Sequence, residues 1–169
     1  TENREASISL LRAALMEPRF DADAIERVRG QVIANIRSNQ KDPNKIASQT
    51  FDKIAFGDHP YGSSLNGTLE TVAALTRDDL LEAHGNVLAR DRIYVGAVGD
   101  ITPEELGQLL DDLLGDLPAE GAPMPPRAEV DIPPGTTLVD FATPQSVALF
   151  GQPGIAQDDP DWFAATVLN

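Results

Sequence analysis

The side chains best suited to metal chemistry in this chain are two histidines, His59 and His84. They lie 25 residues apart, no cysteine is present, and neither histidine belongs to an H-x-x-E-H motif. A catalytic zinc ion needs three protein ligands and an open position that lowers the pKa of bound water. His59 precedes Pro60 in a loop, and His84 lies on the apolar face of an expected helix. We therefore interpret both histidines as structural residues.

Other arrangements of reactive side chains give weaker signals. Ser146 and Thr143 have no histidine near them in the sequence that could complete a catalytic triad. A group of aspartates lacks the glycine and distal glutamate of an EF-hand loop, and helix capping explains it. A pair of glycines forms no phosphate-binding fingerprint, and two adjacent glutamates complement a helix dipole. The aspartates are Asp158, Asp159 and Asp161, the glycines are Gly151 and Gly154, and the glutamates are Glu104 and Glu105.

The charge balance of the chain is strongly acidic. It holds 27 acidic and 13 basic residues, for a net charge of -14. Such a surface repels nucleic acid and anionic lipid and could attract basic peptides, although solubility alone is the simpler interpretation. No apolar run approaches the ~20 residues of a membrane span, so we expect neither nucleic-acid binding nor a span. The lack of cysteine leaves the compartment open between bacterial periplasm and cytoplasm.

The elements that would position these residues are predicted mainly as helices. Apolar residues recur at helical spacing behind capping residues and first-turn prolines. The strongest amphipathic pattern is the leucine stripe that follows Thr102 and Pro103. Six helices are predicted in this part of the chain. The first ends before Pro18, the second follows Asp21 and Asp23, and the third runs from Asp42 to Gly57. The fourth covers about 68–75, the fifth begins at Thr76, and the sixth runs from Thr102 to Gly115.

A change of periodicity after Arg92 predicts strands. Residues 93–98 form a compact β-type run typical of a buried strand, and 137–141 and 146–150 are expected to form two more. Between them, 118–135 holds six of the thirteen prolines and is predicted to be an extended linker. A last helix is expected from Asp159 and Pro160. The layout predicts an α+β fold whose final strand-strand-helix segment opens a second domain.

Short stretches in a fixed order run through nearly the whole chain. They comprise 17–21, 25–29, 57–62, 67–72, 75–80, 95–100, 144–147, 150–154 and 158–161. In this order they resemble the insulinase/pitrilysin-type zinc metallopeptidase family, which includes mitochondrial processing peptidase subunits. The last stretches most resemble the non-catalytic homologues.

The resemblance implies an insulinase/processing-peptidase-like (metallohydrolase-like) fold, in which a β-sheet is covered on one face by helices. Domains of about 200 residues would occur in tandem. On that map the chain is an internal fragment. Residues 1–117 are the helical second half of the first domain, 118–135 are the proline-rich linker, and 136–169 are the start of the second domain.

The resemblance also implies where a zinc-binding carboxylate should stand. Catalytic relatives carry a glutamate one residue before an aliphatic position, and matching that position to Ile36 places Asn35 at the ligand. A second acidic position falls on Val28. A neutral amide is a poor zinc ligand and valine cannot bind zinc, while no carboxylate occurs anywhere in 33–37. The resemblance therefore implies that the metal site is lost, with no catalytic or metal-ligating residue in this chain and its substrate-binding residues unknown.

The sequence favours a non-catalytic subunit or domain that helps a catalytic zinc-peptidase homologue to enclose and recognise peptides. The zinc would belong to that partner, and we expect no activity from this chain by itself. Two alternatives stay open: an active zinc endopeptidase whose H-x-x-E-H motif lies upstream of Thr1, and an assembly scaffold without a peptidase partner. Expected apolar surface at both ends would also allow a homo-oligomer of the fragment.

Overall fold

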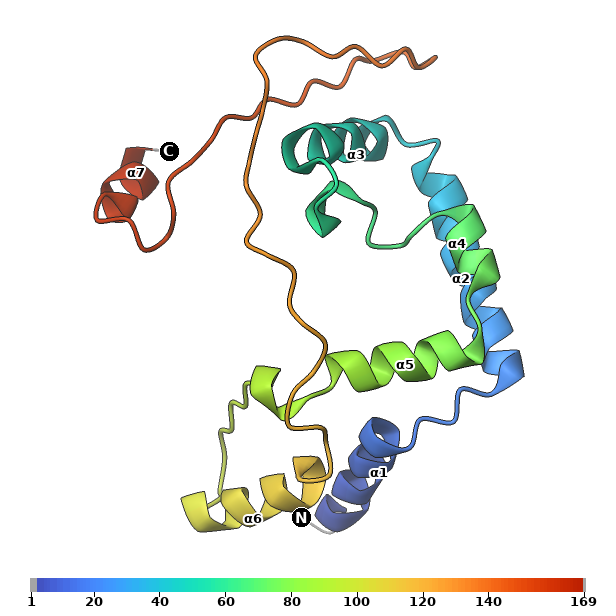
Figure 1. Cartoon of the computed structure of the whole chain (residues 1–169), viewed down its shortest axis with the longest axis vertical. Helices are drawn as coiled ribbons and strands as arrows, with labels where there is room; N and C mark the ends of the chain where they lie inside the picture. The colour runs from blue at the N-terminus through green and yellow to red at the C-terminus, as the bar shows by residue number, and fades with distance from the viewer. Residues whose placement is uncertain (1–2, 169) are drawn as a thin grey trace. The chain divides into compact units, whose positions relative to one another are not determined.

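The computed structural model describes residues 3–168, and all of its regular structure is helical (Figure 1). The α-helices are α1 Arg4–Met16, α2 Ala22–Asn39, α3 Pro43–Phe56, α4 Leu69–Ala74, α5 Arg77–Val87, α6 Pro103–Leu114 and α7 Trp162–Leu168. Two 3₁₀ helices, η1 Pro60–Gly62 and η2 Arg90–Arg92, connect them. The described residues fold into two compact units, the first made of 3–30 and 73–124 and the second of 31–72 and 125–168.

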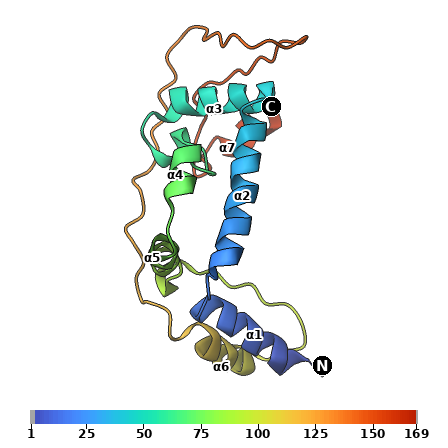
Figure 2. The same cartoon turned by 90° about the vertical axis from the view of Figure 1, so that its right-hand side faces the viewer.

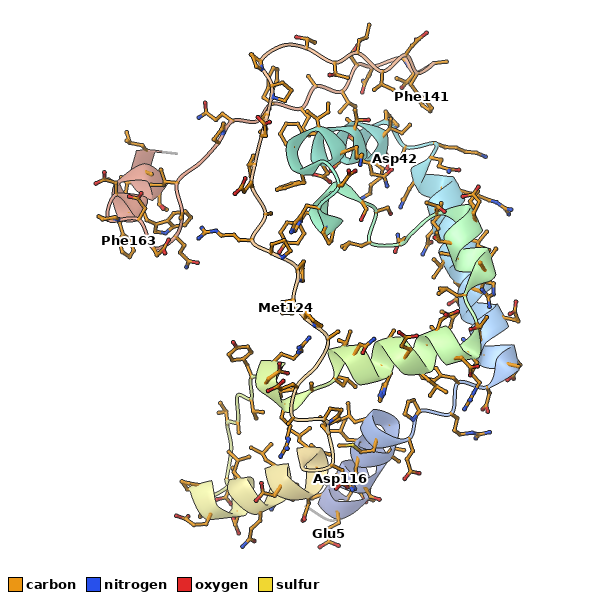
Figure 3. The ribbon with its side chains drawn as sticks, viewed as in Figure 1. Glu5, Asp42, Asp116, Met124, Phe141 and Phe163 are labelled. Atoms are coloured by element: carbon orange, nitrogen blue, oxygen red, sulfur yellow. The ribbon has the colours of Figure 1, made fainter. Side chains whose placement is uncertain are left out.

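The predicted starts of α3, α5 and α6 are confirmed by their capping contacts, whereas α2 begins at Ala22 and α7 at Trp162, without the caps expected for them. The Thr102 hydroxyl accepts from the Glu105 backbone N–H at 3.2 Å, and the Glu105 carboxylate accepts from Thr102 N at 3.1 Å. The same capping box joins Thr76 and Asp79 at the start of α5. Asp42 caps α3 by accepting from Asn44 N at 2.8 Å (Figure 3). Each cap satisfies donors that a helix start leaves unpaired.

In the first unit, α1 packs against α6 (Figure 2). Arg12 of α1 donates to the Asp112 carbonyl oxygen and forms an ion pair with Asp116, which follows α6 (Figure 3). Leu117, in the turn just after these residues, is buried. The leucines of the stripe predicted from the sequence are half-buried.

The segment 118–124 lies against residues 86–92 of the same unit. Three backbone hydrogen bonds join the two stretches, and the Arg92 guanidinium adds contacts to the Asp91 carboxylate at 3.0 Å and the Ala122 carbonyl at 2.9 Å. The hydrogen bond from Arg92 lowers the pKa of Asp91, which keeps this carboxylate charged. These contacts dock this half of the proline-rich segment on its own unit, and its predicted role as an extended linker stays a prediction.

The second unit is organised around α3 and η1. Ala55 of α3 is buried, and its carbonyl accepts from Asp131 N at 3.1 Å, which holds the distal part of the proline-rich segment. Gly151 lies so close to the Phe51 ring that an added Cβ would stand 2.1 Å from the nearest ring carbon. A side chain at position 151 would therefore force the chain away from α3.

The predicted sheet is wrong for this chain. No strand is assigned in residues 3–168, although 93–98, 137–141 and 146–150 are extended or irregular as single stretches. A strand requires a neighbour that accepts and donates its ladder hydrogen bonds, and these stretches find none among the described residues. An apolar, β-branched composition gives a segment the tendency to form a strand but cannot supply its partner.

The domain boundaries predicted at 117 and 136 remain a prediction. Each compact unit is built from two separate stretches of the sequence, so the units do not correspond to the predicted domains and do not test their boundaries. No helix among the described residues combines the length and apolarity that crossing a bilayer requires.

Replacing Thr102 by Ala should lower the free energy of unfolding by about 1 kcal/mol, because it removes the N-cap of α6. Urea titration followed by helical circular dichroism measures this loss. Thr137→Ala is the matched control, because Thr137 is exposed and its side chain makes no hydrogen bond within the described residues. Equal losses in the two variants would contradict the role of the cap.

Helix α5 should lose stability in acid through Asp79. Hydrogen bonds from the Thr76 side chain and then its backbone hold the pKa of Asp79 below the ordinary value of 3.8. The resulting stabilisation is present above that ordinary pKa and is lost as pH falls through the lower folded pKa. Asp79→Asn should flatten this acid limb in circular dichroism followed from about pH 6 to about pH 2. Asp78→Asn, one residue earlier and without the capping bonds, should retain it.

Candidate functional site

The two positions singled out for a lost metal site lie on α2, and both side chains are solvent-exposed. Val28 is 48% exposed, and Asn35 lies two helical turns further along. Seven residues bring side chains back to nearly the same face of a helix. That face of α2 therefore presents an aliphatic group and an amide. Ile36, the aliphatic residue to which the family pattern was matched, is buried.

His84 is engaged in packing within the first unit. Its Nε2 donates to the Leu15 carbonyl oxygen at 2.8 Å, since a carbonyl can only accept. The edge of the Phe20 ring lies against the imidazole, with centroids 6.3 Å apart. His84 therefore ties α5 to the end of α1.

His59 holds a loop of the second unit. Its Nδ1 accepts from Tyr61 N at 3.2 Å and caps η1, and Nε2 donates to the Pro126 carbonyl at 3.0 Å. The Tyr61 ring packs on it edge-on at 4.8 Å. Both ring nitrogens are thus used in structural contacts, because Nε2 carries the donated proton and the lone pair of Nδ1 accepts from Tyr61 N.

The donor set of the described residues does not fit a catalytic zinc ion. Nowhere in residues 3–168 do three His, Asp or Glu side chains converge as metal ligands. The two histidines belong to different units and each is bound to a backbone carbonyl. We therefore derive no reaction step through zinc in this chain.

The remaining candidates also stay apart from one another. Ser146 and Thr143 are exposed and make no hydrogen bond through their hydroxyls in the described chain. The Asp159 carboxylate accepts from Asp161 N at 2.9 Å in a turn, and α7 begins at Trp162 rather than at the predicted Asp159 and Pro160. Glu104 lies in the first turn of α6, where its negative charge complements the helix dipole, as predicted.

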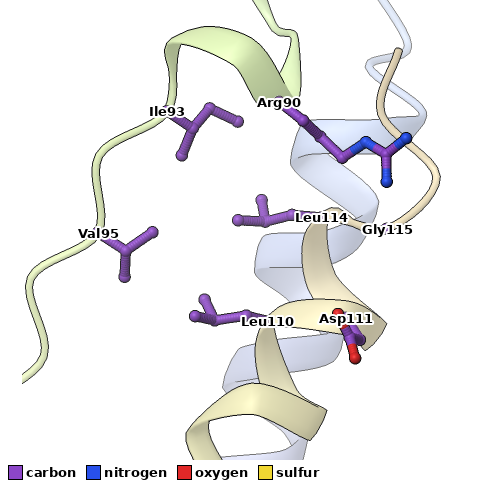
Figure 4. Close-up of a pocket in the computed structure, with 7 residues that line it drawn as sticks. All are labelled: Arg90, Ile93, Val95, Leu110, Asp111, Leu114 and Gly115. Carbon is purple, nitrogen blue, oxygen red and sulfur yellow. The ribbon is translucent and has the colours of Figure 1, made fainter. Parts of the chain in front are cut away.

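One feature that sequence reasoning missed is a groove in the first unit. Its volume is about 220 Å³, and it lies between α6 and the extended chain that follows η2 (Figure 4). Ile93 and Val95 point toward Leu110 and Leu114 across it. The alternation of Ile93 and Val95 in the sequence signals a common face. Which helix that face would meet depended on the fold.

Comparisons with known proteins agree on one family. The profile described as "Peptidase M16 inactive domain" matches residues 74–169. An uncharacterized zinc protease of Mycobacterium leprae is 28% identical over 151 residues, covering 87% of this chain and 34% of that protein. The non-peptidase homolog YmxG of Helicobacter pylori is 25% identical over 152 residues, covering 90% of this chain and 35% of that protein.

Two further relatives extend the comparison. A probable mitochondrial-processing peptidase subunit beta of Schizosaccharomyces pombe is 25% identical and covers 96% of this chain and 37% of that protein. A crystal structure of a peptidase M16 inactive domain from Pseudomonas fluorescens superposes with a TM-score of 0.68 at 24% identity, over 73% of this chain and 30% of that one. That likeness supports the fold. The chain spans about a third of the length of the curated relatives it matches.

Calorimetric titration of Zn²⁺ into this chain should show no tight stoichiometric site, because the ligand geometry is lacking. His84→Ala should lower the free energy of unfolding by about 0.5–1.5 kcal/mol through loss of its bond to Leu15. His84→Ala should leave the zinc titration unchanged. A saturable zinc isotherm that this substitution removes would contradict the structural role of His84.

Proposed function

We propose that this chain, which belongs to the peptidase M16 family, forms a non-catalytic part of a peptidase assembly. In that role it helps a catalytic zinc-peptidase homologue to enclose and recognise peptides. The family profile that matches residues 74–169 is that of the inactive domain. Because the chain spans about a third of its curated relatives, the activity and partners of the whole protein are part of this proposal.

The observation that carries the proposal is the pair of side chains on α2. Asn35 and Val28 stand at the positions where the family resemblance implies acidic residues, and both are exposed on a well-formed helix. An amide lacks the negative charge that offsets the desolvation of Zn²⁺. Both histidines of the chain hold backbone carbonyls. The zinc of the assembly would therefore be held by the partner.

The charge of the chain supports basic peptides as the substrate class. The net charge is -14, and the exposed carboxylates that produce it are ionised at neutral pH, among them Asp58, Glu70 and Asp79, whose pKa values local hydrogen bonds lower further. An acidic surface raises the local concentration of cationic peptides, and salt weakens the effect. In this proposal the chain binds the peptide substrates and the catalytic partner cleaves them.

The test uses the full-length parent protein and a catalytic family member from the same organism. The two should co-elute in size-exclusion chromatography, and the mixture should cleave a basic fluorogenic peptide at least tenfold faster than either protein alone, an order of magnitude that an assembled site readily supplies. Chelation of zinc should abolish this cleavage. Chelator-sensitive cleavage by the parent protein alone would instead support the active endopeptidase.

Asn35→Ala in the parent protein should leave cleavage by the mixture unchanged, because this amide holds no metal. Replacement of a zinc ligand in the catalytic partner should abolish cleavage. A parent protein that neither binds the catalytic homologue nor changes its rate would favour the scaffold without a peptidase partner.

A further inference from the structure

Residues 64–67 form a solvent-exposed turn ahead of α4. The Gly67 N–H donates to the Ser64 carbonyl at 3.0 Å, and the Asn66 N–H donates to the Ser64 hydroxyl at 3.3 Å. Leu65 is 98% exposed, and Asn66 is exposed beside it. The side-chain amide of Asn66 makes no hydrogen bond within residues 3–168. Neither packing nor a polar partner therefore shields this amide from water.

The residue that follows Asn66 leaves this side chain open to attack from the main chain. Of the asparagines whose next residue is in this chain, Asn66 alone precedes a glycine. Glycine has no Cβ, so its backbone nitrogen can approach the preceding side chain without steric hindrance. Gly67 also has a φ of +70°, which glycine adopts readily and other residues rarely adopt. A nucleophilic nitrogen and an electrophilic amide carbon are thus neighbours in an open turn.

From these observations we propose that Asn66 is a site of spontaneous deamidation. The Gly67 backbone nitrogen loses its proton to solvent and attacks Cγ of Asn66, forming a new C–N bond. The C–N bond of the side-chain amide breaks, ammonia leaves with a proton from solvent, and a succinimide ring remains. Water then hydrolyses one or the other carbonyl of this ring, which gives aspartate or isoaspartate. The reaction needs no other reactant, and the inference does not rest on the proposed function.

The hydrogen bonds of the turn set the condition for this reaction, because the Gly67 nitrogen must leave the Ser64 carbonyl before it attacks. The turn is held by the bonds to Ser64 and lies at the surface. Opening an exposed turn costs little free energy compared with opening a helix. Asn86 provides the comparison, since it lies within α5, its carbonyl accepts from Ala122 N at 3.0 Å, and it precedes the branched Val87.

Isoaspartate at position 66 should have a structural effect that aspartate lacks. It routes the main chain through the former side chain and so adds a methylene to the backbone ahead of Gly67. Gly67 has little room to shift, because a Cβ there would lie 2.8 Å from the Thr71 hydroxyl oxygen and 3.5 Å from Cγ2 of Val72. Thr71 exchanges hydrogen bonds with Thr68, and Val72 is buried. The longer backbone should therefore loosen the start of α4.

Peptide mapping of the full-length parent protein tests the site. The protein is aged at physiological temperature and mildly alkaline pH, and samples are digested with trypsin. Asn66 is the sole side-chain amide of the peptide 54–77, and Asn86 is that of 78–90. Mass spectrometry should show Asn66 converting on the order of tenfold faster than Asn86, since about 1.4 kcal/mol of extra local opening is a factor of ten in rate. Equal rates, or an unchanged Asn66, would overturn the inference.

Variants at position 66 separate the reaction from its structural effect. Asn66→Gln should block the conversion, because the longer side chain closes a ring with the next nitrogen far more slowly. Freshly prepared Asn66→Asp carries the new charge on an unaltered main chain. Hydrogen exchange of residues 68–72 should therefore rise in aged wild-type protein and stay unchanged in aged Asn66→Gln and in fresh Asn66→Asp. The same rise in aged Asn66→Gln would contradict the effect of isoaspartate on α4.

Discussion

Most backbone hydrogen bonds among residues 3–168 are made inside helices, at their caps and in turns, and a few others tie the proline-rich segment to residues 86–92 and to Ala55. A helix satisfies its donors and acceptors within one stretch of sequence, whereas a strand depends on a neighbour. This difference decides which segments take regular structure here. The helices form with the caps and prolines that their sequences carry. The apolar segments 93–98, 137–141 and 146–150 remain without a ladder and expose side chains such as Tyr94 and Phe150.

The same demand for hydrogen bonds explains what the histidines do. His84 donates to the Leu15 carbonyl and His59 donates to the Pro126 carbonyl. Each histidine therefore ties together two segments that are far apart in the sequence, which hydrogen bonds within a helix cannot do. Arg92 acts similarly on the segment 118–124. These polar side chains are used for packing the chain. They are consistent with a member of the peptidase M16 family whose matched domain is described as inactive.

The side chains that α2 exposes and those that pack it are set at different positions. Asn35 and Val28 are exposed, and exposed positions contribute little to packing. Ile36, one residue further, is buried and carries the packing.

The sequence by itself determined the starts of α3, α5 and α6, because the capping residues Asp42, Thr76 and Thr102 act on donors within four residues of themselves. The start of α7 lies at Trp162, after the predicted Asp159 and Pro160. It also predicted the structural role of His84 and the family. The tertiary structure decided whether the β-type segments formed a sheet, and it brought Ile93 and Val95 to the leucines of α6. Both outcomes depend on contacts between residues distant in sequence, and local spacing carries no information about such partners.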